Sequence, residues 1–194
     1  MIVISPAKRL ANNISDSSLE ATVPVFKKEA DLLAREMAKL STEELSSMMK
    51  VSEKIAELNA IRYRNWNKRN TEEKRAIFQF EGDVFKHLGA KDLSESQIQY
   101  MNDNLRILSG IYGLLKPSDE MNPYRLEMGT RHDFNGSASL YEFWGDKIAK
   151  ELSEELGNSY LFNLASEEYF SSVSKFLNAE KIINFRFLTV NNGK

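Results

Sequence analysis

The spacing of hydrophobic residues predicts one short strand followed by helices over the first part of the chain. Residues 2–4 (IVI) form a β-branched run, and Pro6 ends it because proline fixes φ and removes a backbone donor. Hydrophobic residues then recur every three or four positions over residues 25–39, which places them on one face of a helix. Residues 41–44 (STEE) form a capping box that opens further helix, continuing to about residue 68.

The rest of the chain mixes strands and helices. Residues 76–80 alternate between apolar and more polar positions, which predicts a strand. Capping boxes at 94–97 and 139–142 open two helices, and the second is predicted to run to Gly157, where a left-handed cap belongs. Further strands are predicted over 107–115, 160–164 and 181–190, with a short helix at 167–173. The pattern therefore predicts a mixed α/β (α+β) protein with a helix-rich N-terminal half.

Two glycines, Gly110 and Gly113, interrupt the apolar run 107–115. We favour a strand with close backbone approach at the glycines, because each glycine would weaken a helix by about 1 kcal/mol. The alternative is a hairpin at Gly-Ile-Tyr-Gly whose backbone N–H groups bind a phosphate.

A hairpin-turn signal lies at residues 191–194 (NNGK), because Asn-Gly accepts the positive φ that tight turns require. No return strand follows it in the 194 residues. We therefore expect a single domain over residues 1–194 that lacks its C-terminal hairpin arm.

Composition narrows the class of protein. With 42% hydrophobic and 28% charged residues, the 194-residue chain can bury a sizeable core. A net charge of −2 gives no overall attraction to nucleic acid or anionic lipid, so any such contact must use a local patch. Zero cysteines exclude thiolate and sulfur-ligated metal chemistry, and two histidines leave few metal ligands. We expect no metal and no cofactor.

No stretch approaches the roughly 20 apolar residues that a membrane span requires. The N-terminus also lacks the basic region and cleavage site of a signal peptide. We therefore expect a cytoplasmic protein without a membrane partner.

Two polar segments follow predicted strands, where open α/β sheets place ligand-binding loops. After the first strand, Ser5, Lys8 and Arg9 offer a hydroxyl and two cations to a phosphate; the alternative is a solvated loop. After the strand at 160–164, Asn163 and Ser166 form a similar cluster, for which helix capping by Ser166 is the favoured alternative.

A third candidate is the segment 124–129 with Arg131. If residues 125–129 are extended, Arg125, Glu127 and Gly129 face one way while the apolar residues between them face the other. Arg125 and Glu127 then suit either a structural ion pair or a guanidinium poised on an anion.

A basic segment at residues 62–69 interleaves four cations with two aromatic residues. Arg62, Arg64 and Arg69 are candidates for phosphate contacts, because nucleic-acid binding combines cations with stacking side chains. Helical spacing favours the alternative of a solvated helix face with Trp66 turned toward the core.

Six blocks of sequence resemble the YaaA family of peroxide-stress proteins over residues 2–194. The blocks lie at residues 4–8 (ISPAK), 81–84 (EGDV), 105–117 (LRILSGIYGLLKP), 123–129 (PYRLEMG), 140–146 (LYEFWGD) and 163–170 (NLASEEYF). The resemblance implies a central mixed β-sheet or partial barrel wrapped by helices. It also implies a cytosolic protein that protects against hydrogen peroxide, keeps free iron low and binds duplex DNA without sequence preference.

In that family, DNA binding is attributed to a positive cleft beside a helix-hairpin-helix element. The resemblance places the hairpin at residues 108–116, with Gly110, Gly113 and Lys116, and cleft cations at Lys8, Arg9, Arg125 and Arg131. It also implies a return strand and a basic segment beyond residue 194, whose absence weakens the expectation of DNA binding.

Two functions therefore stay open. The first is a DNA-binding stress protein, and the second is an enzyme or binder of a small phosphate- or carboxylate-bearing ligand. The second requires Ser5, Lys8, Arg125 and Glu127 to converge on one pocket. Direct iron binding is disfavoured, because carboxylates with at most two histidines make a poor iron(II) site.

Overall fold

The centre of the fold is a mixed five-stranded sheet. The computed structural model describes residues 1–11, 20–68 and 74–186. The sheet has the order β6-β5-β1-β8-β9 and is built from β1 (Ile2–Ile4), β5 (Leu105–Ser109), β6 (Gly113–Leu115), β8 (Leu161–Asn163) and β9 (Ile182–Asn184). Its strands are parallel except for β6, which pairs antiparallel with β5. The predicted central mixed sheet is confirmed, and it is open rather than closed into a barrel within the described ranges.

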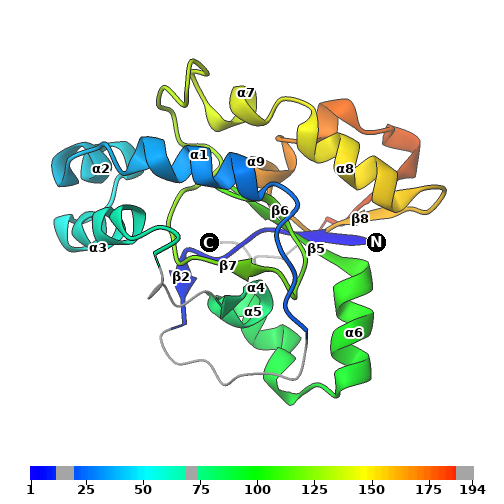
Figure 1. Ribbon diagram of the computed structural model, residues 1–194. Helices are drawn as coiled ribbons and strands as arrows, with labels where there is room; N and C mark the ends of the chain where they lie inside the picture. Colours follow the sequence, from blue (N-terminus) through cyan, green and yellow to red (C-terminus); the bar gives the residue numbers. More distant parts are fainter. Residues whose placement is uncertain (12–19, 69–73, 187–194) are drawn as a thin grey trace, which may run out of the picture.

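Helices cover both faces of this sheet. Figure 1 shows α8 (Lys147–Leu156) and α6 (Glu95–Asn104) on opposite sides of it, with α7 (Leu140–Trp144) continuing the layer of α8. The strands between them are buried on both faces: Ile107 and Leu108, neighbours in β5, are each 0% exposed. Burial on both faces is why the adjacent Ile107 and Leu108 are both apolar rather than alternating with polar residues.

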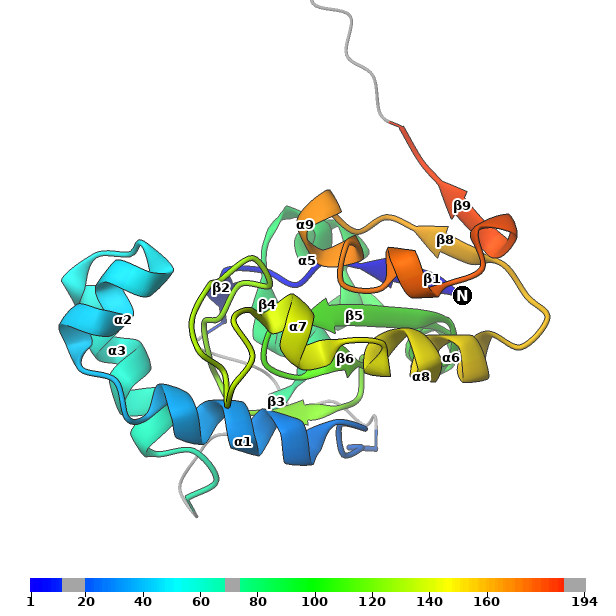
Figure 2. The same cartoon turned by 90° about the horizontal axis from the view of Figure 1, so that it is seen from above.

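The helix-rich N-terminal half is confirmed. It contains α1 (Lys27–Met37), α2 (Thr42–Met49) and α3 (Glu53–Arg64). The capping box predicted for α2 is present, since the Ser41 hydroxyl accepts from the backbone N–H of Glu44 and the Glu44 carboxylate accepts from the N–H of Ser41. Figure 2 shows the α2–α3 pair beside the sheet, separated from it by the segment that leads to α7.

Smaller elements join these parts. Two antiparallel pairs are formed by β2 (Arg9–Leu10) with β4 (Phe80–Glu81) and by β3 (Lys74–Arg75) with β7 (Glu120–Met121). The remaining elements are short helices or 3₁₀ turns: α5 (Asp83–Leu88), α9 (Glu167–Phe170), η1 (Ala90–Asp92), η2 (Ser174–Phe176) and η3 (Ala179–Lys181).

The strand predicted at residues 76–80 is wrong. Residues 76–79 form a short helix, α4 (Ala76–Gln79), and all four of its side chains are buried. The alternation of apolar and polar residues misleads here because Gln79 is buried too, with its amide nitrogen donating to the carbonyl of Ala11. An alternating pattern indicates a strand only when one face is exposed to solvent, and this segment has no exposed face.

The helix predicted from residue 139 to Gly157 is interrupted by one glycine and ends at another. The helix expected from residue 139 to Gly157 is split into α7 and α8 at Gly145, whose φ is +51°. The helix ends before Gly157 as predicted, but the left-handed cap is not formed: Gly157 has a φ of +54° with a ψ of −119°.

The run 107–115 is a β-hairpin rather than one strand. Ile107 pairs with Leu115 across β5 and β6. The expected close backbone approach at both glycines is confirmed: a Cβ on Gly110 would lie 2.2 Å from the Leu126 carbonyl oxygen, and one on Gly113 would lie 2.8 Å from the Trp144 ring. Gly113 also has a φ of +67°.

Three expectations fall wholly or partly outside the described residues. They are the end of the strand predicted over 181–190, the turn at 191–194 and the placement of Arg69. Within the described part, β9 confirms a strand at Ile182–Asn184.

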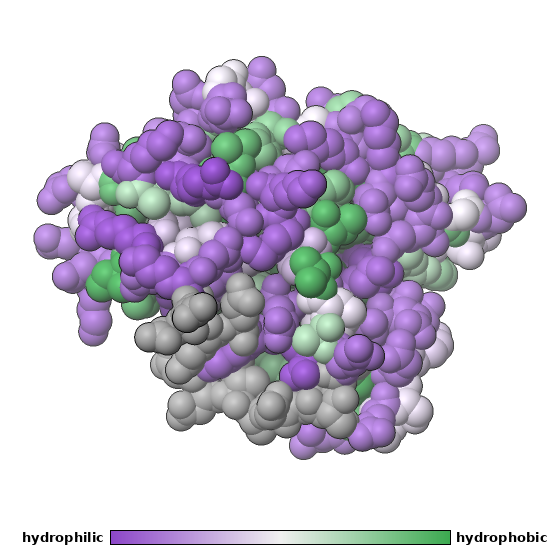
Figure 3. All heavy atoms as spheres, in the orientation of Figure 1, coloured by the Kyte–Doolittle hydropathy of each residue, from purple (hydrophilic) through white to green (hydrophobic). Residues whose placement is uncertain are grey.

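The surface seen in Figure 3 is mostly hydrophilic, with hydrophobic side chains in small separate groups. Among the described residues, no helix is both long and apolar enough to cross a membrane.

Candidate functional site

Two of the predicted polar loops meet at the carboxyl edge of the sheet. The strands β1 and β8 are parallel neighbours, so the residues that follow them lie at the same edge. Ser5 follows β1, and its hydroxyl accepts a 2.8 Å hydrogen bond from the backbone N–H of Ser166, which follows β8. The two hydroxyls also bond at 3.1 Å. This pairing holds the loop after β1 against the start of α9.

The same loop reaches the third predicted segment through Lys8. The Lys8 ammonium lies 3.0 Å from Oε2 of Glu127, and Arg125 donates from NH2 to Oε1 of Glu127 at 3.0 Å. The predicted alternation is confirmed, because Leu126 and Met128 are buried while the polar residues between them reach the surface. Glu127 thus connects two cations that are more than 100 positions apart in the sequence.

A cavity of about 620 Å³ opens beside this ion-pair network. It is lined by residues 47–50 at the end of α2, by Arg125, Glu127 and residues 129–131, and by Glu168 of α9. The side chains of Lys50 and Arg131 are exposed and pair with no carboxylate in the described part of the chain. With Lys8 included, the site holds four cations against two carboxylates. Its excess positive charge suits an anion.

Arg125 retains donors that the protein does not use. Its side chain is 20% exposed, and its Nε is buried without a hydrogen-bond partner. A buried unsatisfied donor costs about 1–3 kcal/mol. Since this Nε is closed to solvent, only the exposed part of the Arg125 side chain is available to a ligand in the cavity. The backbone of Arg125 is fixed from behind, because the Tyr63 hydroxyl donates to its carbonyl at 2.8 Å.

Two residues of the site escaped the sequence analysis. Glu168 accepts a 2.9 Å hydrogen bond from the backbone N–H of Gly129, and its own carbonyl accepts from the Tyr141 hydroxyl. Lys50 reaches the cavity from the C-cap of α2, where it has a φ of +52°. The block at residues 163–170 contains Glu168 and pointed to it indirectly. The sequence around Lys50 carries no comparable signal, since only tertiary packing brings α2 to the segment 125–131.

Three buried tyrosines lie in or contact the segment 124–129, outside the cavity lining. Burial raises the pKa of Tyr63, Tyr124 and Tyr169, and the Glu168 and Glu127 carboxylates add to the rise at Tyr169. The Tyr124 hydroxyl lies 2.6 Å from the Ser109 hydroxyl. These phenols therefore stay protonated at neutral pH and serve as hydrogen-bonding groups.

Five of the predicted ligand residues lie outside the cavity lining: Ser5, Lys8, Arg9, Asn163 and Ser166. Of the four side chains expected to converge on one pocket, only Arg125 and Glu127 line it. Arg9 is exposed in β2, paired across the ladder with Glu81. The Asn163 amide donates to Asn184, and its oxygen accepts from the N–H of Ala165. Ser166 occupies the N-cap position of α9, but its hydroxyl bonds to Ser5 instead of capping the helix.

The glycines proposed to bind DNA phosphates are buried. Gly110 lies in the turn between β5 and β6 and packs against Leu126, whereas Gly113 is the first residue of β6 and packs against Trp144. Strands flank this turn, so the helix-hairpin-helix expected at residues 108–116 is corrected to a β-hairpin. In this position the glycines serve close packing, and their backbone does not reach a phosphate at the surface.

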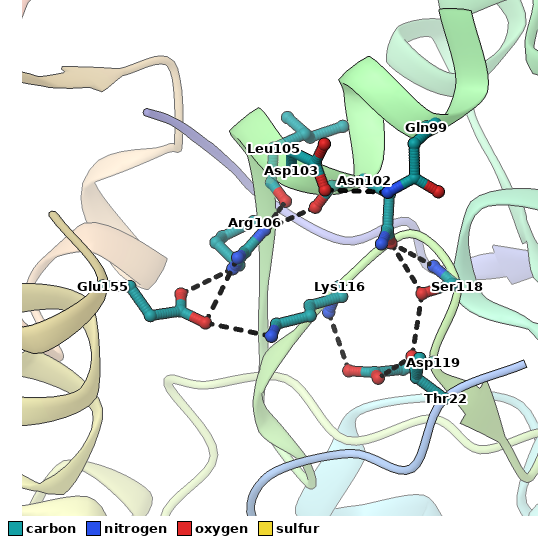
Figure 4. A network of polar contacts seen from close by, with 10 residues as sticks. All are labelled: Thr22, Gln99, Asn102, Asp103, Leu105, Arg106, Lys116, Ser118, Asp119 and Glu155. Atoms are coloured by element: carbon teal, nitrogen blue, oxygen red, sulfur yellow. Dashed lines mark hydrogen bonds and ion pairs between the residues drawn. The ribbon is translucent and has the colours of Figure 1, made fainter. Parts of the chain in front are cut away.

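Lys116 belongs to a separate polar network, shown in Figure 4. Its ammonium lies 3.3 Å from the Glu155 carboxylate, which also receives two hydrogen bonds from the buried Arg106, at 2.6 and 3.1 Å. The backbone N–H of Lys116 donates to Asp119. This network joins β5 and β6 to α8 and lies outside the cavity lining.

The basic segment of α3 turns its aromatic side chain inward. The Trp66 indole N–H donates to Asp31 at 2.8 Å, and its ring contacts those of Tyr63 and Tyr112. Arg62 is half-buried, which lowers the pKa of its guanidinium, whereas Arg64 is exposed. The predicted inward position of Trp66 is confirmed.

Comparison with known proteins assigns the chain to a family. All 194 residues match the family described as peroxide stress protein YaaA. The chain belongs to this family. A UPF0246 protein of Aliivibrio fischeri strain MJ11 is 46% identical over 178 residues, covering 89% of this chain and 69% of the relative. A UPF0246 protein of Shewanella woodyi is 43% identical over 199 residues, covering 100% of this chain and 78% of the relative. Membership in the YaaA family supports a role in peroxide stress.

Proposed function

We propose that this chain acts in peroxide stress by binding a small ligand that carries a phosphate or carboxylate group. The observation that carries the proposal is that Lys50, Arg125 and Arg131 line one cavity. Glu127 of the same lining pairs with Arg125 and with Lys8, which lies outside the lining. Four cations against two carboxylates leave charge for a ligand to neutralise. The Arg125–Glu127 ion pair is present and borders an open cavity, which supports a role for Arg125 in holding an anion beside its structural one.

The proposal predicts that phosphate perturbs the cavity and little else. We would titrate the ¹⁵N-labelled chain with inorganic phosphate and follow the amide resonances of Lys50 and Gly129, which line the cavity. Both should shift in a saturable way, because the bound anion lies beside their backbone. In Arg125→Gln the phosphate affinity obtained from these shifts should be about tenfold weaker, as expected for the loss of one charge-assisted contact.

Arg35→Gln on α1 is the matched control, because Arg35 bonds to the Asp31 carbonyl and does not line the cavity. It should titrate like the unchanged chain. Shifts that are absent at Lys50 and Gly129, or that persist unchanged in Arg125→Gln, would contradict the proposal.

Duplex DNA is the second candidate ligand. The excess of cations at the site and the exposed Arg9 and Arg64 favour it, together with the family resemblance. Binding without sequence preference requires an affinity that falls steeply with salt. Replacing Lys8 or Arg131 by Gln should reduce the slope of log K against log salt by about 1 each. Fluorescence anisotropy with a labelled duplex measures the affinity at each salt concentration. A slope unchanged in both variants would contradict DNA binding at this site.

The link to low free iron and the cytoplasmic location complete the proposal, and the family resemblance supports both. A strain deleted for the gene should show raised unincorporated iron by whole-cell EPR under peroxide. The unchanged sequence should restore the lower value, whereas Arg125→Gln should not. Restoration by Arg125→Gln would separate the iron effect from this cavity.

A further inference from the structure

The cavity beside α2 carries features that select among anions. We propose that its ligand is a phosphate monoester with an organic body, an inference that rests on the proposed anion-binding function and narrows it. Three properties of the cavity support this choice: its charge, the direction of its donors and its size.

The charge of the site exceeds what a carboxylate neutralises. Glu127 is held by Lys8 and Arg125 together, so those cations are only partly compensated. Lys50 and Arg131 have no carboxylate partner among the described residues. The cavity lining has one more cation than carboxylates, and the excess is two when Lys8, which pairs with Glu127 from outside the lining, is counted. A phosphate monoester carries a charge of about −1.5 to −2 at pH 7, compared with −1 for a carboxylate.

The donors also approach from different sides. Lys50 stands at the end of α2, whereas Arg125 and Arg131 stand at either end of the segment that forms another wall. Arg125 uses NH2 for Glu127, and its side chain keeps 20% of its surface exposed at the cavity. Three terminal oxygens of a phosphoryl group can accept from separated donors, whereas the two oxygens of a carboxylate lie in one plane.

The volume requires more than a bare phosphate. At about 620 Å³ the cavity falls within the range of sites for small organic molecules. Met48 and Met49 contribute an apolar wall beside Lys50. Thioether side chains adapt to the shape of an apolar group, so an organic body can pack on them while the phosphoryl group meets the cations.

The experiment compares three probes by calorimetric titration of the 194-residue chain. Phenyl phosphate has both the dianionic head and the organic body, benzoate has the body with a carboxylate, and inorganic phosphate has the head alone. Phenyl phosphate should bind about tenfold more tightly than either of the others.

Variants separate the two parts of the ligand. Lys50→Gly removes a cation at a position with a φ of +52°, which glycine adopts without strain, so the fold should be kept. It should weaken phenyl phosphate about fivefold to tenfold without lowering Tm. Met48→Ala should abolish the advantage of phenyl phosphate over inorganic phosphate. Lys150→Gln, 70% exposed on α8 and outside the cavity lining, is the control and should change neither value.

The same phosphoryl chemistry has two sources, a free metabolite or the phosphorylated end of a nucleic-acid strand. A short single-stranded oligonucleotide with and without a 5′-phosphate distinguishes them. If only the phosphorylated strand binds, the ligand is the phosphorylated end of a nucleic-acid strand. If phenyl phosphate binds and neither strand does, the ligand is a free metabolite.

Equal affinity for benzoate and phenyl phosphate would overturn the phosphate-monoester inference and leave the anion site standing. Equal affinity for inorganic phosphate and phenyl phosphate would overturn the inference that the ligand carries an organic body. Failure of all three probes would overturn the proposed function as well.

Discussion

At the scale of single residues, hydrogen bonds from neighbouring groups hold the residues of the site in place. Arg125 is held through its backbone by Tyr63, and Glu168 is held by the N–H of Gly129. The sequence identified Arg125, Glu127 and Arg131, because an alternating segment is a local signal, but it did not identify Glu168. Lys50 could not be identified that way, since only the packing of α2 brings it to the cavity.

The buried glycines provide a residue-scale prediction. Gly110→Ala should destabilise the fold by about 4 kcal/mol, because its Cβ would lie 2.2 Å from a backbone oxygen that cannot move freely. Gly136→Ala, where φ is +87° but no atom lies within 4 Å, should cost only about 1 kcal/mol. Urea unfolding measures both. A Gly110→Ala chain as stable as Gly136→Ala would contradict the packing of the hairpin.

At the scale of elements, local sequence signals succeeded where one local interaction decides the structure. The capping boxes at Ser41 and Ser94 open helices as predicted. The hydrophobic pattern gave the wrong element at residues 76–79, where every side chain is buried and no alternation between core and solvent exists. It also gave the wrong element at residues 107–115, where two closely packed glycines lie in a hairpin. In both cases tertiary burial overrides the pattern along the chain.

Helix capping can be tested with a matched pair of serines. Ser41→Ala should destabilise the fold by about 1 kcal/mol, because the α2 capping box loses its side-chain acceptor. Ser52 occupies the same position before α3 but makes no side-chain capping bond. Ser52→Ala should therefore change the free energy of unfolding by less than about 0.5 kcal/mol. Equal effects of the two substitutions in urea unfolding would contradict this assignment.

At the scale of the whole molecule, the network of Figure 4 connects the sheet to its covering helices. Glu155 on α8 binds Arg106 of β5, whose side chain is 6% exposed, and Lys116, which follows β6. Burial alone would raise the pKa of Glu155, but the hydrogen bonds and charges of Arg106 and Lys116 lower it below the ordinary value of 4.5. The ionised carboxylate therefore stabilises the folded state.

Glu155→Gln should cost about 3 kcal/mol at pH 7, because Arg106 remains buried without its counter-charge. The lowered pKa sets the sign of the pH dependence. The contribution of Glu155 is fully present above pH 4.5 and is lost as the pH falls through the lower folded-state value. The difference from the unchanged chain should thus be constant from neutral pH to about pH 5 and narrow below pH 4.5.

Glu154→Gln, at the exposed neighbouring position, is the control and should change stability by less than about 0.5 kcal/mol. Chemical denaturation over a pH series measures both variants. A difference that widens in acid would contradict the role of the Glu155 carboxylate.

The central claim is that the cavity between α2 and the segment 125–131 binds an anion. The most direct measurement is an anomalous difference map from crystals of the chain soaked in selenate, a heavy analogue of an oxyanion. We expect a selenium peak inside the cavity, within hydrogen-bonding distance of Arg125 and Arg131 or Lys50. A map with selenium peaks only elsewhere on the protein would contradict it.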